Sequence, residues 1–428
     1  MTSERTIIGI LVGGGPAPGI NSVIGAATIR SILGGCDVLG ILDGFKWLME
    51  GSSGNVRPLS IEDVSRLHFR GGSYLGTSRA NPTKKVEHLD HVLSTLINLG
   101  VTRLITIGGD DTAFSALKLE ERAAGRIQVV HVPKTIDNDL DLPNGISTFG
   151  FQTARHVGVE IVKNLMVDAL TTSRWYFAVT MGRKAGHLAL GIGKAAGATL
   201  TVIPEEFTER PVRLKRLVDL LVGAVIKRFS HGRTDGVVVL AEGLIEILDQ
   251  QDLGGLEQVA RDEHGHLRLS EVDVGALLRR EVTKELSALG HPISIVAKDV
   301  GYELRCADPI PFDLDYTRDL GYCAAQFLLD GGTAAMVSIQ NGRFTPIPFK
   351  QMVDPTTGRT KVRMVDVGSQ SYDIARQFMI RLTHEDLDDP VLLGRCAAVA
   401  GLSPESFRER FAGVVGSATN HETKGRKP

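Results

Sequence analysis

Residues 6–21 read TIIGILVGGGPAPGIN, an apolar run that stops at three glycines and leads into a helical pattern. A continuous apolar run that ends at glycine is typical of a buried parallel strand. Glycines allow the backbone to turn tightly, and the N–H groups at the start of the next helix can bind an anion. The segment matches neither GxGxxG nor GxxxxGK[ST], so it gives little support to a dinucleotide-dependent oxidoreductase or a P-loop protein. The alternative is a tight turn that binds nothing.

The alternation of strand and helix continues along the chain. Further strands are expected at 37–42, 103–107, 127–132, 175–180, 199–203, 236–240 and 293–297, and helices at 21–33, 86–99, 112–124, 153–169, 212–230 and 272–289. Repeated βα units imply parallel sheets with helices on both faces, and the length requires two such lobes. The predicted fold class is therefore α/β, with two Rossmann-like lobes built on mostly parallel sheets flanked by helices. The polar, acidic stretch 244–270 is expected to be an insertion.

Composition and charge exclude several other classes. Glycine supplies 48 of the 428 residues and 43% of residues are apolar, without a G-X-Y period, which excludes collagen and low-complexity disorder. Lys and Arg number 48 against 50 Asp and Glu, so the net charge of −2 provides no field to attract nucleic acid or a membrane surface. With no membrane-length apolar run and no signal-peptide pattern, we expect a cytoplasmic protein without nucleic-acid or membrane partners. The four widely spaced cysteines are expected to be reduced thiols.

A second glycine motif, GGDDT at 108–112, directly follows an expected strand. Two adjacent carboxylates repel each other unless a cation compensates, and Mg²⁺ is commonly bound through one or two carboxylates together with substrate phosphates. The alternative is that Asp110 and Asp111 cap the helix expected to start at Thr112. Capping and metal binding can coexist.

A third motif, PKTIDND at 133–139, follows the next strand. Lys134 could neutralise phosphate charge, Thr135 could bond a substrate oxygen, and a carboxylate could accept a hydroxyl proton. A turn built from Asp-Asn-Asp is the alternative. Three such motifs at successive strand ends favour a phosphate-binding site, because ligands of parallel sheets bind at the carboxyl ends of the strands.

This ordered set of motifs resembles the phosphofructokinase family, specifically its pyrophosphate-dependent branch, from about residue 6 to about residue 342. The resemblance implies the phosphofructokinase fold, with residues 1–150 as a lobe that binds the donor and Mg²⁺ and 151–304 as a sugar-phosphate-binding lobe. Residues 305–416 are expected to pack back on both lobes, and 417–428 to form a disordered tail.

On the donor side, Gly14 of the first glycine motif matches the family's donor-binding glycine. The segment GGSYLGTSR at 71–79 resembles the second glycine loop, with Arg79 as its basic residue. In GGDDT, Gly109 matches a diphosphate-binding position and Asp110 matches the magnesium-linked aspartate. The implied cofactor is Mg²⁺.

The third motif, PKTIDND at 133–139, resembles the family's catalytic loop. There Asp137 matches the general base that takes the proton from the sugar 1-hydroxyl, and Thr135 matches a substrate-binding residue. ATP-using members typically have glycine where this chain has Asp111 and Lys134. Both side chains would fill space otherwise left for the nucleotide, and Lys134 would add positive charge for a pyrophosphate, which has no adenosine to anchor it. The implied catalytic set is Asp137, Lys134 and Asp111.

On the sugar side, the resemblance implies a set of substrate-binding residues: Thr135, Asp137, Arg174, Met181, Gly182, Arg183, Glu242, Tyr302 and Arg305. Arg174 matches an arginine contributed across a subunit interface, which implies a homo-oligomer, a dimer or larger. Tyr302 and Arg305 match the pair that holds the 6-phosphate. The family often has a further arginine that helps to bind the 6-phosphate. This chain has Val296 at that position, and Lys298 could replace the arginine.

The predicted function is reversible phosphoryl transfer from pyrophosphate to the 1-hydroxyl of fructose 6-phosphate, giving fructose 1,6-bisphosphate and phosphate, in glycolysis and gluconeogenesis. One alternative is an ATP-dependent 6-phosphofructokinase, which Asp111 and Lys134 disfavour. Another is a non-catalytic regulatory subunit of the same fold, which the intact catalytic set disfavours. Other sugar phosphates, such as sedoheptulose 7-phosphate, are alternative acceptors.

Overall fold

The computed structural model describes residues 6–253 and 272–415. The tail expected at 417–428 lies outside the described residues, as does most of the insertion expected at 244–270. Within the described ranges, no helix is long and apolar enough to cross a membrane.

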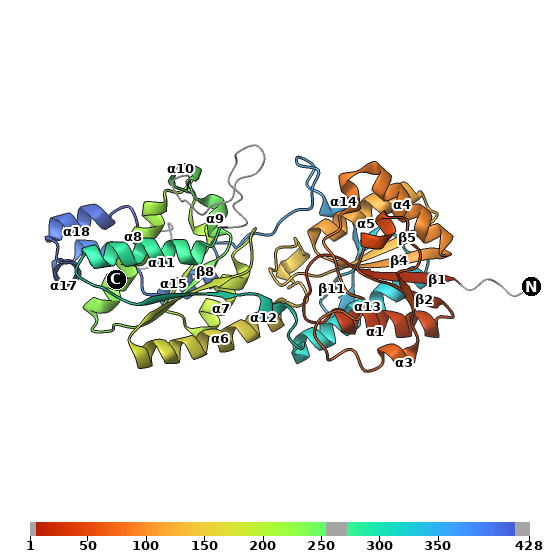
Figure 1. Ribbon diagram of the computed structural model, residues 1–428, viewed down its shortest axis with the longest axis horizontal. Coiled ribbons are helices and arrows are strands. Elements are labelled where there is room, and N and C mark those ends of the chain that lie inside the picture. The colour runs from red at the N-terminus through yellow and green to blue at the C-terminus, as the bar shows by residue number, and fades with distance from the viewer. Residues whose placement is uncertain (1–5, 254–271, 416–428) are drawn as a thin grey trace, which may run out of the picture. The chain divides into compact units, whose positions relative to one another are not determined.

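The chain forms two compact units, each with its own sheet (Figure 1). Unit 1 contains the chain up to residue 157 together with residues 302–363. Unit 2 contains residues 158–301 together with the chain from residue 364 onward. The C-terminal part of the chain is therefore divided between the two units.

A seven-stranded sheet forms the centre of unit 1, in the order β13-β10-β5-β4-β1-β2-β3. The strands are β1 (Ile7–Val12), β2 (Asp37–Ile41), β3 (Val56–Pro58), β4 (Val101–Gly108), β5 (Gln128–Pro133), β10 (Ala335–Met336) and β13 (Ile347–Pro348). The five inner strands run parallel, and the edge strands β3 and β13 are antiparallel to their neighbours. Because β1, β4 and β5 are adjacent and parallel, the segments that follow them lie at one edge of the sheet. These segments are the three motifs of the sequence.

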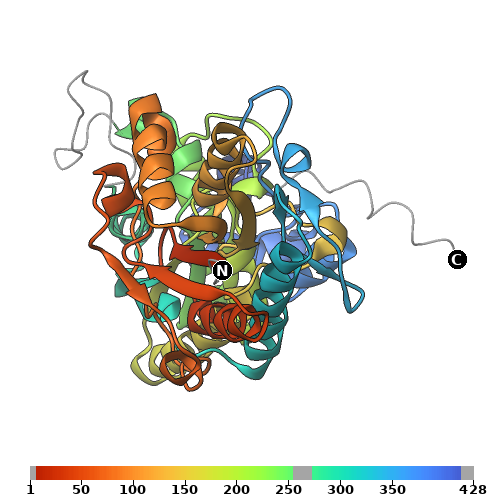
Figure 2. The ribbon, with the colours of Figure 1, turned by 90° about the vertical axis from the view of Figure 1, so that its right-hand side faces the viewer.

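Helices cover both faces of this sheet. The helical segments are α1 (Ile20–Leu33), α2 (Lys46–Met49), α3 (Ile61–Val64), η1 (Pro82–Lys84), α4 (Val86–Asn98), α5 (Asp110–Ala123), η2 (Pro143–Gly145), α12 (Tyr302–Arg305), α13 (Pro311–Leu329) and α14 (Phe349–Met352). Figure 2 shows α1 and α13 side by side on one face, while α4 and α5 lie on the other face (Figure 1). A small hairpin of β11 (Ile339–Gln340) and β12 (Arg343–Phe344) completes the unit.

Apolar burial explains why β1 is central. Ile8, Ile10 and Leu11 are fully buried, and Leu11 packs in one cluster with side chains of α4, α5, β4 and β5. Burying apolar side chains on both faces of a parallel strand is what a continuous apolar run allows. The strand predicted from residues 6–12 is therefore confirmed, and so is the α/β fold class.

Unit 2 is built on a four-stranded parallel sheet, in the order β7-β8-β6-β9. Its strands are β6 (Trp175–Thr180), β7 (Leu200–Val202), β8 (Gly236–Ala241) and β9 (Ile295–Val300). The helices are α6 (Phe151–Thr172), which begins in unit 1, and α7 (His187–Ala196), η3 (Pro204–Glu206), α8 (Leu214–Ser230), α9 (Leu244–Ile247), α10 (Gln250–Leu253), α11 (Val274–Ala288), α15 (Gln370–Gln377), α16 (His384–Asp388), α17 (Pro390–Ala400) and α18 (Pro404–Phe411).

The expectation that residues 244–270 form a polar insertion is wrong for residues 244–253, the part that the structure describes. Residues 244–253 form the short helices α9 and α10, and Leu244, Ile245 and Leu253 are buried in the core of the unit. The acidic residues later in the stretch dominated its composition and hid this apolar start. Five of the first ten residues of the expected insertion therefore belong to the core, namely Leu244, Ile245, Ile247, Leu248 and Leu253.

Candidate active site

The first glycine loop, residues 13–19, connects β1 to α1 and is bonded to the second glycine loop. The N–H of Gly14 donates to the carbonyl of Ser78 at 2.8 Å, and the hydroxyl of Thr77 donates to the carbonyl of Gly14 at 2.7 Å. Gly14 has φ +82°, a left-handed conformation that favours glycine. The two loops therefore form one structure at the end of β1.

Asn21, in the first turn of α1, holds the second glycine loop in place. Its side-chain amide donates to the carbonyls of Arg70 and Gly71, both at 3.1 Å, and its oxygen accepts from the N–H of Tyr74 at 2.7 Å. Asn21 is buried. Sequence reasoning quoted this residue as part of a motif without giving it a role. Arg79, at the end of the second loop, is exposed.

The paired carboxylates lie in the first turn of α5. The helix begins at Asp110 and its N-cap is Gly109, so the alternative that Asp110 and Asp111 cap a helix starting at Thr112 is wrong. Carboxylates in a first turn are favoured by the helix dipole. Asp110 is partly buried, and Asp111 is exposed. An added Cβ on Gly108 would lie 2.4 Å from the Thr112 side chain, so this turn is too tight for any larger residue.

Lys134 is a buried cation beneath the first glycine loop. Its side chain is only 4% exposed, and its ammonium group donates to the carbonyl of Gly15. Burial lowers the pKa of Lys134 to about 8, although the carboxylates of Asp137, Asp139 and Asp110 favour its charged form. The nearby charge of Arg305 lowers this pKa further.

The loop at 133–139 is held by a hydrogen bond within it and by hydrogen bonds to Thr148. The hydroxyl of Thr135 accepts from the N–H of Asp137 at 3.0 Å, and the hydroxyl of Thr148 donates to the carbonyl of Thr135 at 2.8 Å. Asn138 has φ +57°, and its side-chain oxygen accepts from the N–H of Thr148 at 3.0 Å. The backbone bends at residues 136 and 137 and is left-handed at Asn138, but residues 137–139 do not form a hydrogen-bonded turn, and Asp137 stays partly exposed.

Tyr302 and Arg305 belong to α12 of unit 1. The guanidinium of Arg305 lies 4.6 Å from the ring centroid of Tyr302, whose side chain is 74% exposed. The Nη1 atom of Arg305 stands 3.2 Å from the place of a Cβ on Gly15. Its Nε atom is buried and has no hydrogen-bond partner among the described residues. Arg305 therefore lies beside the first glycine loop and keeps an N–H group that can still donate a hydrogen bond.

In unit 2, the expected sugar-binding residues lie at the ends of β6 and β8. Arg183 donates through Nε to Glu242 at 3.0 Å, and their side chains are 50% and 31% exposed. Gly182, with φ +122°, makes the turn after β6, where the N–H of Glu242 donates to the carbonyl of Thr180 at 2.9 Å. An added Cβ on Gly301 would lie 2.6 Å from the side chain of Met181.

Arg174 directly precedes β6 and is partly buried. Its Nε atom has no hydrogen-bond partner in the part of the chain that the structure describes. Val296, the position of the missing arginine, pairs with Tyr176 inside the sheet, and Lys298 follows it in β9, partly buried. Arg174 and Arg305 thus each keep one buried guanidinium nitrogen without a hydrogen-bond partner among the described residues.

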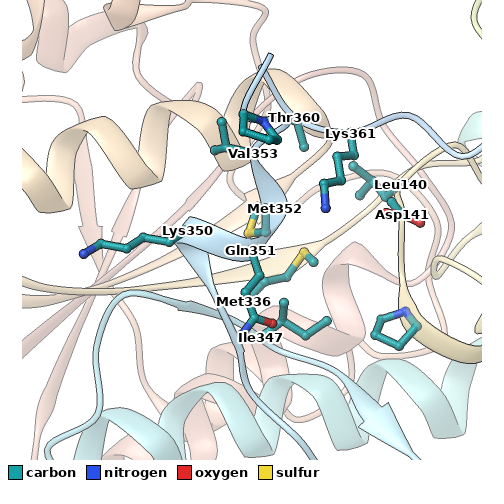
Figure 3. A pocket seen from close by; sticks show the side chains of 12 residues that line it. Leu140, Asp141, Met336, Ile347, Lys350, Gln351, Met352, Val353, Thr360 and Lys361 are labelled. Atoms are coloured by element: carbon teal, nitrogen blue, oxygen red, sulfur yellow. The ribbon is translucent and has the colours of Figure 1, made fainter. Parts of the chain in front are cut away.

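A cavity of about 510 Å³ lies in unit 1 next to the catalytic loop (Figure 3). It is lined by Leu140 and Asp141, which follow that loop, and by residues of the later segment such as Met352 and Lys361. Lys361 reaches toward the cavity, whereas Lys350 points away from it (Figure 3). None of the residues proposed from the sequence lines this cavity. Across residues 6–253 and 272–415, no group of three or more His, Cys, Asp or Glu side chains is placed to hold a metal ion.

The sequence profile described as phosphofructokinase matches residues 7–328. The chain belongs to the phosphofructokinase family. It is 54% identical over 409 residues to a pyrophosphate–fructose 6-phosphate 1-phosphotransferase of Thermotoga maritima, covering 94% of this chain and 97% of that protein. It is 48% identical to an enzyme of the same name from Naegleria fowleri, covering 95% of each chain.

A solved structure agrees with the phosphofructokinase fold. The pyrophosphate-dependent phosphofructokinase of Nitrosospira multiformis superposes with a TM-score of 0.67, covering 88% of this chain and 90% of that one. At 16% identity this likeness concerns the fold alone.

Proposed function

We propose that this chain transfers a phosphoryl group from pyrophosphate to the 1-hydroxyl of fructose 6-phosphate, giving fructose 1,6-bisphosphate and phosphate. The observation that carries the proposal is the buried Lys134 ammonium under the first glycine loop. A fixed cation there suits a small, highly charged donor that has no nucleoside to anchor it. The names of the Thermotoga maritima and Naegleria fowleri relatives support the same donor and acceptor.

On the donor side, Gly14, Gly109 and Arg79 would bind the diphosphate together with Lys134. The glycine loops offer backbone N–H groups, and Arg79 is exposed and free to turn toward an anion. Asp110, at the start of α5, would bind Mg²⁺, which usually needs only one or two protein carboxylates besides substrate phosphates. Bound Mg²⁺ would supply charge neutralisation between the phosphates.

In the reaction, Asp137 would accept the proton of the sugar 1-hydroxyl as that oxygen attacks the terminal phosphorus of pyrophosphate. The other phosphate leaves as the new ester bond forms. Lys134 would stabilise the negative charge on the transferring group from its fixed position. Asp111, exposed beside Asp110, would restrict the space that a nucleotide donor needs. The phosphoanhydride of pyrophosphate releases less free energy than that of ATP, so the step is expected to run in both directions.

On the acceptor side, the residues proposed to bind the sugar phosphate are Thr135, Asp137, Met181, Gly182, Arg183, Glu242, Tyr302 and Arg305. Glu242 would accept a sugar hydroxyl, and Arg305 with Tyr302 would bind the 6-phosphate. The exposed Arg183–Glu242 pair can exchange its mutual bond for contacts to a ligand at little cost, since such pairs contribute little free energy.

We further propose that the chain works as a homo-oligomer in the cytoplasm, in glycolysis and gluconeogenesis. Arg174 would reach the substrate of a neighbouring subunit, which would give its buried, unpartnered Nε an acceptor. Lys298 would take the place of the arginine that is missing at Val296.

The direct test is a coupled assay of fructose 1,6-bisphosphate formation with Mg²⁺ and either pyrophosphate, ATP or no donor. Activity with pyrophosphate alone is the expected result. Activity with ATP and none with pyrophosphate would instead assign the chain to the ATP-dependent enzymes. Inactivity with both donors, in a folded protein, would favour a regulatory subunit.

A further inference from the structure

Arg363 makes a dense set of hydrogen bonds to the catalytic loop, although it lies 225 positions away from Asn138 in the sequence. Its Nε and Nη2 atoms donate to the carbonyl of Asn138 at 3.1 and 3.0 Å, and Nη2 also donates to the side-chain oxygen of Asn138. Its Nη1 atom donates to the carbonyl of Ile146 at 2.7 Å. Its backbone N–H donates to the carbonyl of Asp139 at 2.8 Å.

Three of these four acceptors, the two oxygens of Asn138 and the carbonyl of Asp139, belong to the two residues that directly follow Asp137. Asn138 has a left-handed φ of +57°, which a residue other than glycine adopts at a cost. The N–H of Thr148 donates to the Asn138 side chain, and Arg363 donates to both the side chain and the carbonyl of Asn138. The peptide groups directly after Asp137 are thereby fixed by a planar, charged donor, and hydrogen bonds of this kind are stronger than neutral ones.

The segment that carries Arg363 also contacts the loop of the paired carboxylates. Val353 pairs with Thr360 and Val362 pairs with Leu140, so this segment folds back on itself and along the catalytic loop. The hydroxyl of Thr360 donates to the carbonyl of Asp110 at 3.3 Å. One C-terminal segment, which lies beyond the residues matched by the family profile, therefore contacts both carboxylate loops.

The charge of Arg363 is permanent and partly buried. Burial lowers its pKa, and the carboxylates of Asp141 and Asp139 oppose that shift, but a guanidinium keeps its proton at any physiological pH. The hydrogen-bond geometry, and not a titration, therefore determines what this side chain does.

We propose that Arg363 is a positioning residue, which holds the left-handed backbone at Asn138 so that the Asp137 carboxylate meets the sugar 1-hydroxyl in the reactive geometry. This inference rests on the proposed function, because it assigns to Asp137 the role of the base. Misplacing a reacting group by about 1 Å can cost on the order of 100-fold in rate.

The test compares Arg363→Ala and Arg363→Lys with the unaltered protein in the pyrophosphate assay. We expect kcat of Arg363→Ala to fall by about 10- to 100-fold, while the KM values of both substrates change little, because the substrate contacts remain. Free guanidinium at millimolar concentration should restore part of the lost kcat, since it can occupy the vacated position. Lysine offers a single ammonium group in place of the planar guanidinium. The kcat of Arg363→Lys should therefore lie between those of Arg363→Ala and the unaltered protein.

Two controls separate positioning from folding. Arg126 is a matched control in the same unit, because it also donates to two main-chain carbonyls, those of Ala123 and Arg122, and Arg126→Ala should keep its kcat. Asp137→Ala should be slow and insensitive to guanidinium. Thermal unfolding of each variant gives its folded fraction, and kcat is calculated per folded molecule.

Each outcome has one meaning. A lowered melting temperature with unchanged kcat per folded site, or a lowered kcat that guanidinium leaves unchanged in both Arg363 variants, overturns the positioning role. Failure of the unaltered protein to use pyrophosphate overturns the proposed function itself. Normal activity of that protein together with normal activity of Arg363→Ala overturns only this inference.

Discussion

The ammonium group of Lys134 donates to the carbonyl oxygen of Gly15, so the residue that follows β5 supports the loop that follows β1. The bond is possible because these strands lie on either side of β4 in one parallel sheet. A Cβ on Gly14 would stand 3.4 Å from the same nitrogen, so the ammonium group lies close beside this glycine as well. A diphosphate bound at this loop would meet a charge that is already in place.

The first prediction concerns pH. Burial lowers the pKa of Lys134 from 10.5 to about 8, so its charge disappears as the pH rises through that value. At pH 9 only about a tenth of the lysines would be charged, and we expect the KM for pyrophosphate to rise about fivefold between pH 8 and pH 9. Steady-state kinetics across this range would measure it. Lys134→Met should have a high KM for pyrophosphate that does not change between pH 8 and pH 9. If the KM of Lys134→Met rises as much as that of the unaltered protein, another group causes the pH dependence.

The same shift predicts a pH-dependent stability. Between about pH 8 and pH 10.5 the unfolded chain binds a proton at Lys134 that the folded chain has lost. The free energy of unfolding should therefore rise with pH in this window, since the unfolded state holds more protons. Below pH 8 both states are charged, and the cost of burying the charge is present in full. Denaturant titrations of the unaltered protein and of Lys134→Met should diverge in this window, and parallel curves would contradict the lowered pKa.

The second prediction concerns the choice of donor. Lys134→Gly removes a charged hydrogen-bond donor, and we expect the KM for pyrophosphate to rise by about 10- to 100-fold, the equivalent of a charge-assisted hydrogen bond. Asp111→Gly should have a smaller effect, because Asp111 is exposed. Kinetics with pyrophosphate and with ATP would be measured for both variants and for the double variant. Lys118→Ala, on the exposed side of α5, is the control. An unchanged KM in Lys134→Gly would remove this lysine from the donor site.

The sequence predicted the central strands of unit 1 and the loops that follow them because the relevant signals are local. The apolar run of β1 and the motifs after β4 and β5 each lie within a few residues, and parallel strands bring their carboxyl ends together without further information. The start of α5 was misplaced by two residues, because Asp110 and Asp111 suit both an N-cap and a first turn.

Contacts between distant segments could not be predicted in this way. Asn21 bonds to the second glycine loop about 50 positions later, and Arg363 bonds to Asn138 across 225 positions. Neither residue type has a periodicity or spacing that reveals a long-range partner. The burial of Leu244 was missed for a related reason, because composition averaged over a stretch conceals a short apolar start.

The third prediction concerns the base. Asp137→Asn keeps the shape of the side chain and removes its basicity, so kcat should fall by about 100-fold or more. Binding of fructose 6-phosphate, measured by calorimetry, should stay nearly the same because the other contacts to the sugar remain. Asp141→Asn is the control, since Asp141 is an exposed carboxylate at the end of the same loop. Equal activity of Asp137→Asn and the unaltered protein would exclude Asp137 as the base.

The last prediction separates two possible ligands of Arg305. The family resemblance gives it the sugar 6-phosphate, yet its Nη1 atom stands 3.2 Å from the place of a Cβ on Gly15, beside the donor loop. For Arg305→Met we expect the KM for fructose 6-phosphate to rise by about 10- to 100-fold, because a charge-assisted hydrogen bond to the 6-phosphate is lost. The KM for pyrophosphate should change by less than the KM for the sugar phosphate. Arg318→Met, an exposed arginine on α13, serves as the control and should leave both values unchanged. A rise confined to pyrophosphate would place Arg305 in the donor site, because an arginine that binds only the sugar phosphate has no direct contact with the donor.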